Sequence, residues 1–507
     1  MLPAILAFCG FYVASSDQPM FNDATQVVLM RDGTRTVLSM QNNYKGPPDA
    51  FAMVVPVPTV LHEGDVKTLA KDVFDHVEKM GAPRLVEYWE QDPCAPPPPE
   101  YDRMVMAKSP APMATGAAGG GGKDLGVKIE AQFTVGEYQI VILSAKDSSG
   151  LETWLHQEKY NIPAGAEPLL RPYVEGGMKF FVAKVDPAKV QWVGEGNDKH
   201  AALSPLRFHY DSDRFDLPIR LGLANSQGTQ DLIVNILATE RYETANYPNT
   251  TIPTNIDLNE GMKDKFAGFY AALFDNTLEK HPGNVITEYA WNSGSCDPCP
   301  GPTLQPNEIA TLGGDILQKN PYELTLTRMH ARYGKDIKDD LVFKAAKPIV
   351  GGREFVQSGG KLESGAQPST MNNFQARYAI RHAWQGPIKC TAPVRNRWGG
   401  PWAGQPQSQT QPATGLAFAK RDEVKLVNAL AHPDPQIDLG SGAFPPIAPT
   451  ETGSAGSAMG SAAPATSSTE KPKKKSGCGC QTDDRNELGT AAFLVGVGLL
   501  IRRRRKV

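Results

Sequence analysis

The feature that most constrains this chain is its C-terminal end, where an apolar run meets a cluster of arginines. Residues 488–501 carry no charge, and they are followed directly by Arg502, Arg503, Arg504 and Arg505. This order is typical of a stop-transfer segment, and the positive-inside rule keeps such arginines on the cytoplasmic side. We therefore expect the rest of the chain to lie outside the cytoplasm, anchored in the membrane or held at the cell surface.

The apolar run is short. Its fourteen residues would span about 21 Å as a transmembrane helix, against a hydrocarbon core of about 30 Å. This length suits a transient tag better than a permanent anchor. The alternative, a buried helix at a domain end, would require five consecutive cations, residues 502–506, to terminate a core element.

Two cysteines precede the apolar run, in the sequence Gly477-Cys478-Gly479-Cys480. With the run and the arginines behind them, residues 477–507 resemble the myxobacterial C-terminal sorting signal. The resemblance implies export, cleavage by the sorting machinery near Cys478 or Cys480, and retention at the cell surface. The alternative is a metal site, for which no further ligand residues lie nearby in the sequence. At the other end, residues 1–7 resemble the last part of a secretory signal peptide with cleavage after Ala7.

Composition divides the rest of the chain. Residues 403–476 are rich in Gly, Ala, Pro, Ser and Thr, and are expected to form a disordered stalk. A second Gly-rich stretch, about 107–123, is expected to be a flexible insert. Between the two ends this leaves a secreted ectodomain over residues 8–402, long enough to bury a substantial core.

The net charge of −3 conceals an asymmetry between the ectodomain and the C-terminal end. Residues 471–507 hold ten Lys and Arg against three Asp and Glu, which leaves 42 basic and 52 acidic residues before them. The rest of the chain therefore carries a net charge near −10. Nucleic-acid binding is not expected, because a phosphate backbone requires a basic surface.

Strand patterns dominate the ectodomain. Residues 26–31 and 35–41 flank Asp32-Gly33, a pair that favours a tight hairpin turn. A second hairpin is predicted over residues 127–134 and 137–143, and further strands over 51–57, 179–185 and 232–239. Helices are predicted from apolar spacing after an N-cap at Asp65, from a capping box at Ser149, and over 266–280. The fold class expected is α+β: a β-rich ectodomain of antiparallel hairpins with several packed helices.

Five cysteines remain once Cys478 and Cys480 are assigned to the tag, and they are Cys9, Cys94, Cys296, Cys299 and Cys390. In an oxidising compartment disulfide bonds are the expected state. Five cysteines cannot all pair within one chain, so one thiol stays unpaired or bonds to another molecule. The sequence does not reveal the pairing.

The Cys296-Asp297-Pro298-Cys299 motif allows two other roles. A redox dithiol normally opens a helix after a strand, whereas Pro300-Gly301-Pro302 follows this motif and argues against a helix. A zinc site would require further ligands, for which His382 or Cys390 are the candidates. Disulfide formation remains the preferred interpretation.

No recognised catalytic motif is present. The sequence lacks HExxH, Gly-x-Ser-x-Gly and a phosphate-binding GxxxxGK[ST] loop. His209, His330 and His382 are expected to be hydrogen-bonded or surface residues. Neither catalytic residues nor a cofactor are therefore predicted, although carboxylates distant in the sequence can still converge in the fold.

Several segments together resemble a bacterial family designated domain of unknown function 2330. The resemblance rests on the following segments: 9–13, 31–38, 51–58, 84–94, 169–174, 179–186, 203–225 and 378–390. It extends over about Cys9 to Trp402. It implies a secreted protein and no assigned activity, so no functional residues are transferred from it.

We expect a non-catalytic envelope protein that binds or scaffolds envelope material. Its expected partners are the membrane, through the C-terminal segment, the export and sorting machinery, and envelope polysaccharide or protein. One alternative is a secreted hydrolase with two carboxyl groups about 5–9 Å apart in a polar cleft. The other is a metal or redox module at Cys296 and Cys299.

Overall fold

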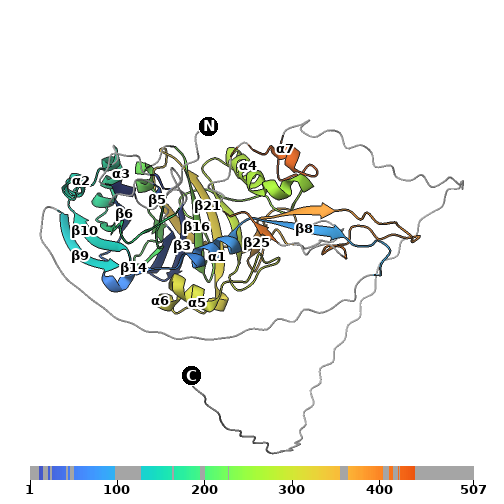
Figure 1. The fold of residues 1–507 in the computed structure, drawn as a ribbon, viewed down its shortest axis with the longest axis horizontal. Coiled ribbons are helices and arrows are strands. Elements are labelled where there is room, and N and C mark those ends of the chain that lie inside the picture. Colours follow the sequence, from blue (N-terminus) through green and yellow to red (C-terminus); the bar gives the residue numbers. More distant parts are fainter. Residues whose placement is uncertain are drawn as a thin grey trace, which may run out of the picture. The chain divides into compact units, whose positions relative to one another are not determined.

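The computed structural model describes one folded unit, within residues 1–447. The residues it describes are 11–14, 21–22, 25–41, 44–45, 51–96, 127–162, 165–193, 200–225, 228–353, 363–403, 410–414, 421 and 423–439. The unit is a mixed α+β fold in which strands predominate (Figure 1), as the sequence predicts.

An eleven-stranded sheet forms the centre of this unit. Most neighbouring strands are antiparallel, but β3 and β16 run parallel. The strands in spatial order are β24 (Gln367–Pro368), β23 (Ile349–Gly351), β25 (Asn373–Gln375), β20 (Val285–Asn292), β21 (Thr325–Tyr333), β16 (Gln230–Ala238), β3 (Thr25–Asp32), β4 (Arg35–Gln41), β14 (Leu206–Asp211) and β7 (Val66–Thr68), with β18 (Asn249–Thr251) paired to β20.

A five-stranded antiparallel sheet packs against one face of the central sheet. Its strands in order are β1 (Phe11–Ala14), β6 (Phe51–Val57), β11 (Lys179–Val185), β10 (Tyr138–Ala145) and β9 (Val127–Val135). Alternate side chains of the two sheets, such as Val55, Phe181, Leu29 and Val234, share one buried apolar cluster. The opposite face of the five-stranded sheet carries Val54 and Val182, which pack with Leu151 and Leu170 from two helices.

The helices cover the outer faces of both sheets. Helices α2 and α3 cover the five-stranded sheet, while α1, α5 and α6 pack beside β3, β4 and β20 of the central sheet. The helices are α1 (Lys71–Gly81), α2 (Ser148–Gln157), α3 (Ala166–Glu175), α4 (Phe266–Lys280), α5 (Pro306–Ile309), α6 (Asp315–Leu317) and α7 (Leu426–Ala429). Gly313, just before α6, permits this packing, because a Cβ there would lie 2.7 Å from Cγ1 of Val37.

Three smaller sheets complete the described fold. A five-stranded sheet contains β19 (Ile256–Leu258), β26 (Arg377–His382), β8 (Arg84–Glu90), β27 (Trp398–Gly399) and β28 (Gln411–Pro412). A four-stranded sheet contains β12 (Gln191–Val193), β13 (His200–Ala202), β5 (Tyr44–Lys45) and β2 (Phe21–Asn22). A three-stranded sheet contains β15 (Asp216–Leu217), β22 (Leu341–Ala346) and β17 (Arg241–Thr244).

Both predicted hairpins are confirmed. β3 and β4 pair on either side of a turn in which Gly33 has φ +55°, a conformation that glycine adopts at little cost. β9 and β10 form the second hairpin. The predicted strands over 51–57 and 179–185 correspond to β6 and β11, and β16 begins two residues before the predicted strand at 232.

Two of the three helix starts differ from the prediction. The helix expected after Asp65 begins at Lys71, because Val66–Thr68 pair with β14 as strand β7. The second helix is capped by Asp147, whose side chain accepts a hydrogen bond from the Gly150 amide, and not by Ser149. The third, α4, spans the predicted residues 266–280.

The folded unit also extends beyond the predicted boundary at residue 402. Strand β28 pairs with β8, and α7 packs on α4 through Leu426 and Ala429. Gln436 exchanges two hydrogen bonds with the backbone of Thr254. Residues 423–439, which composition assigned to the stalk, are therefore part of the fold. The predicted insert at 107–123 lies outside the described residues.

Candidate functional site

The end of β8 and the chain around it form a projection that we call the arm, residues 87–96 and 381–403. In Figure 1, β8 extends away from the central sheet. One edge of β8 pairs in parallel with β26, and the other pairs antiparallel with β27 and β28. β8 therefore has strand partners on both edges, along residues 84–89 on one edge and at 84–85 and 89–90 on the other.

Aromatic side chains concentrate in the arm. Trp89 stacks on His382 with ring centroids 4.7 Å apart, and Trp384 meets Trp402 edge to face at 5.8 Å. The Arg381 guanidinium lies 5.0 Å from the ring centroid of Trp398. The arm thus contains four of the seven tryptophans of the chain, each partly exposed, and they are Trp89, Trp384, Trp398 and Trp402.

A buried carboxylate organises the arm. Glu90 accepts two hydrogen bonds from Arg395, both 2.8 Å, and one each from the backbone amides of Trp384 and Asn396. Burial opposes ionisation of Glu90, but these donors outweigh it and lower the pKa of the carboxyl. The ionised carboxylate therefore holds the loop 392–397 against the end of β8.

A disulfide bond between Cys94 and Cys390 closes the arm near its end. The Val394 amide donates a 2.9 Å hydrogen bond to the carbonyl oxygen of Pro93, next to this disulfide. The predicted disulfide state is confirmed for Cys94 and Cys390. Nearby, the side chains of Ile388 and Val394 are 46% and 57% exposed. The arm therefore ends in apolar side chains that face solvent.

A second cluster of polar residues lies in the core. Successive side chains of the buried strand β21 point to opposite faces of the sheet. Arg328, His330 and Arg332 therefore lie on the same face. Arg328 donates to Glu288 at 2.6 Å, and Arg332 donates two hydrogen bonds to Asp231. His330 lies between both carboxylates, 2.9 Å from Glu288 and 3.4 Å from Asp231. An irregularity between Thr287 and Tyr289 frees Glu288 from strand pairing and directs it to this group.

Two helices and Arg421 complete this cluster. From α1, Glu78 accepts a 2.6 Å hydrogen bond from Arg328. From α4, Phe274 stacks on His330 with ring centroids 3.8 Å apart, and the Tyr270 hydroxyl donates to Glu288. Arg421 forms ion pairs with Asp275 of α4 and with Asp231 of β16. These ion pairs connect residue 421 to the central sheet.

The cluster is electrically balanced when His330 is protonated. Four carboxylates, Glu78, Asp231, Asp275 and Glu288, then face three arginines and one imidazolium. Burial raises the pKa of Glu288, but Arg328 and His330 outweigh it and lower that pKa to about 2. Burial lowers the pKa of His330, but Glu288 and Asp231 outweigh it and raise that pKa. Glu288, His330 and Asp231 are at most 3% exposed, so a substrate cannot reach them, and we interpret the cluster as structural.

The Cys296 to Cys299 motif forms a small disulfide-closed loop on the surface. Its backbone is held by two buried side chains, since Arg84 donates to the Pro298 carbonyl oxygen at 2.9 Å and Gln375 donates to that of Asp297 at 2.5 Å. The next helix, α5, begins only at Pro306, so neither cysteine opens a helix.

The structure does not assemble the proposed zinc ligands. Cys390 is bonded to Cys94, and His382 lies between Glu87 and Glu260, at 3.0 and 2.8 Å. Within the part of the chain that the structure describes, no three His, Cys, Asp or Glu side chains are grouped to hold a metal ion. His209 lies 3.2 Å from Asp65. All three histidines are therefore hydrogen-bonded or ion-paired, as expected.

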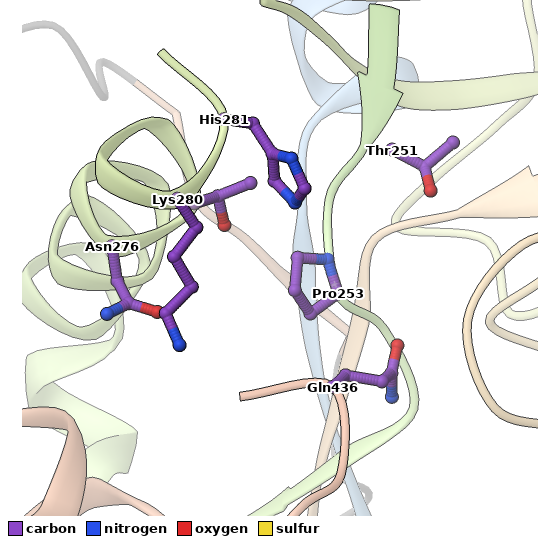
Figure 2. Close-up of a pocket in the computed structure, with 7 residues that line it drawn as sticks. Thr251, Pro253, Asn276, Lys280, His281 and Gln436 are labelled. Atoms are coloured by element: carbon purple, nitrogen blue, oxygen red, sulfur yellow. The ribbon is translucent and has the colours of Figure 1, made fainter. Parts of the chain in front are cut away.

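Several hollows open on the surface of the described residues. The one in Figure 2 lies between the end of α4, the segment after β18 and Gln436, and its volume is about 180 Å³. In that view Lys280, His281 and Asn276 come from the helix side, and Thr251 and Pro253 come from the opposite wall. This volume falls below the roughly 300–1,000 Å³ of typical small-molecule sites.

A larger hollow of about 430 Å³ lies beside the disulfide loop. It is bounded by α1 and by residues 300–302. His76, on its wall, contacts Glu308 at 2.6 Å and the Pro302 carbonyl oxygen at 2.7 Å. Both ring nitrogens of His76 therefore already have partners.

The sequence contains a signal for the buried polar cluster and a weaker one for the arm, although neither is a catalytic motif. The pattern Arg328-x-His330-x-Arg332 within a strand places two arginines and a histidine on one side at a spacing of two. The arm has a weaker signal, the density of tryptophan and arginine over residues 381–402. Its partner segment at 87–94 is distant in the sequence, so composition alone does not bring the two together.

Several predicted sites lie outside the described residues. These are Cys9, Cys478, Cys480, Arg502 to Arg505, the signal remnant 1–7 and the apolar run 488–501. Among the residues that are described, no helix has the length and hydropathy required to cross a bilayer.

No curated protein and no solved structure matches the chain. Residues 3–344 match the family described as "Uncharacterized protein conserved in bacteria (DUF2330)". This match agrees with the resemblance of the N-terminal segments, but it ends before segment 378–390. Since it covers more than half of the 507 residues, the chain belongs to the DUF2330 family.

Proposed function

We propose that this chain is an exported envelope protein without catalytic activity, whose arm binds envelope material. The observation that carries the proposal is the concentration of four partly exposed tryptophans in a projection fixed by a disulfide bond and by Glu90. Trp, Tyr and Arg are the residues that most often dominate binding energy at interfaces. A fixed projection also loses little conformational entropy on binding.

The proposed location rests on the two ends of the chain. The apolar run 488–501 with its arginines, and Cys478 and Cys480 before it, support export followed by sorting to the cell surface. Two disulfide bonds in the ectodomain are in keeping with an oxidising compartment. The partners under this proposal are the membrane, the sorting machinery, and envelope polysaccharide, protein or lipid.

Binding is tested by co-sedimentation of the full chain with isolated cell envelopes. We expect Trp384→Ser/Trp402→Ser to lower the affinity at least about tenfold, because each removes a large contact surface. Tyr322→Ser is the matched control, since Tyr322 is an aromatic outside the arm with 38% exposure. Far-UV circular dichroism verifies that both variants fold. Equal sedimentation of the double variant and the wild type would show that these arm tryptophans do not bind the envelope, and would contradict the binding role of the arm.

Location is tested separately by cell fractionation and mass spectrometry of the mature termini. We expect a surface fraction and a C-terminus close to Cys478 or Cys480. An intact chain among cytosolic proteins, with reduced cysteines, would contradict export.

A further inference from the structure

The tip of the arm brings together two of the exposed apolar side chains of the described surface. We define the tip as residues 93–94 and 387–395. Among the described residues, four large hydrophobic side chains are exposed, and two of them, Ile388 and Val394, belong to the tip. The other two, Tyr322 and Met371, lie in different parts of the chain.

The tip is held in place on both sides. The disulfide between Cys94 and Cys390 joins its two segments two residues from Ile388. The hydrogen bond from the Val394 amide to Pro93 fixes the other apolar residue beside the same disulfide. These two links hold the backbone at Cys390 and Val394, close to the exposed apolar side chains.

The arm contains four basic residues, Arg381, Lys389, Arg395 and Arg397, and three acidic residues, Glu87, Glu90 and Asp92, so its net charge is +1. All three acidic residues lie in the segment 87–96. Residues 383–403 contain Lys389, Arg395 and Arg397 and no acidic residue, whereas the chain before residue 471 has a net charge near −10. Arg395 is neutralised by Glu90, and Arg397 donates to two backbone carbonyl oxygens. Lys389 is exposed between the two apolar residues and supplies the positive charge of the tip.

We propose that the tip docks onto an anionic lipid surface, with Ile388 and Val394 entering the boundary between headgroups and acyl chains. This inference rests on the proposed binding role of the arm. Exposed aliphatic side chains beside a cation are the combination that holds peripheral proteins at anionic membranes. The acidic body is repelled by such a surface, so only the tip approaches it.

A sugar polymer fits the tip less well. Sugars are bound by open aromatic faces and hydrogen-bonding groups, whereas the tip, residues 93–94 and 387–395, contains no aromatic side chain. The exposed groups at the tip are branched aliphatic chains, which hydrocarbon accommodates and water does not.

The experiment uses the full chain and vesicles of phosphatidylcholine, with or without phosphatidylglycerol. Hydrogen exchange followed by mass spectrometry reads each peptide separately, so the apolar run 488–501 does not obscure the tip. We expect peptides within 383–397 to exchange more slowly with anionic vesicles and unchanged with neutral ones. Identical exchange of these peptides with and without anionic vesicles would overturn the proposal.

Variants assign the effect to the side chains. Ile388→Asp/Val394→Asp is expected to weaken the vesicle-dependent protection about tenfold or more, and Lys389→Glu to abolish the preference for anionic lipid. Met371→Asp is the matched control, because Met371 is 58% exposed away from the tip. Vesicles could leave hydrogen exchange at the tip unchanged while envelope binding still depends on Trp384 and Trp402. That result would contradict lipid binding by the tip and would leave the proposed binding role of the arm intact.

Discussion

Replacing Glu288 with Gln tests whether the buried ionic cluster stabilises the fold. Gln has the shape of Glu but no charge, and its amide group presents hydrogens where the carboxylate only accepts. Glu288 accepts from Tyr270 and His330 with one oxygen and from Arg328 with the other. At least one of these donors therefore meets another donor in the variant, and Arg328 retains only Glu78 as a charged partner.

The size of the loss follows from two independent estimates. A carboxyl pKa lowered from 4.5 to about 2 corresponds to about 3 kcal/mol of stability at neutral pH. Breaking a buried ion pair by removing one partner typically costs about 3–5 kcal/mol. Both values are below the roughly 5–15 kcal/mol that stabilises most domains, so we expect a folded but clearly weakened protein.

Denaturation by urea at pH 7, followed by tryptophan fluorescence and circular dichroism, measures this loss. The matched control is Asp211→Asn, which breaks the exposed ion pair with Arg35. Exposed pairs contribute less than about 1 kcal/mol, so the control should change the midpoint little. A loss for Glu288→Gln no larger than that of the control would refute the role assigned to the cluster.

Two further predictions concern pH and the disulfide bonds. The pKa of His330 is raised above 6.5, so its stabilisation is complete below pH 6.5 and is lost as pH rises through the folded-state pKa. His330→Gln should therefore flatten the alkaline part of a plot of urea midpoint against pH, and an unchanged slope above pH 6.5 would contradict this assignment. Replacing Cys94 and Cys390 with Ser should cost up to about 5 kcal/mol, because this disulfide links residues 296 positions apart. The same change at Cys296 and Cys299, three positions apart, should cost no more than about 2 kcal/mol; equal losses in non-reducing urea titrations would contradict the loop-length argument.

The elements that the sequence predicts well are those determined by neighbouring residues. The β3–β4 hairpin depends on a two-residue turn at Gly33, and α4 depends on apolar spacing that ends before Pro282-Gly283. Local patterns predict the wrong element where a segment pairs with a strand that is distant in the sequence. Val66 fits the apolar face of the predicted helix, but pairing of Val66–Thr68 with β14 removes that segment from α1.

The candidate sites were less accessible to sequence reasoning because they join residues far apart. Glu90 and Arg395 are separated by 305 positions, and Glu78 and Arg328 by 250. Nothing in the local sequence indicates that these charges meet. Composition also misassigned residues 423–439, because the few apolar side chains among polar ones, such as Leu426, suffice to pack against α4.

The family match ends at residue 344, whereas the folded unit continues beyond it. The pairing of strand β8 shows that the later residues belong to the same domain. β8 lies within the matched residues 3–344, yet every strand paired with it in the described structure, β26, β27 and β28, lies beyond residue 344. The same holds for Cys94 and Glu90, whose partners are Cys390 and Arg395. Without the later segments β8 would expose two unpaired edges, and Glu90 would lose its charged partner. The residues after 344 are therefore a structural part of the domain, and the arm can form only where both segments are present.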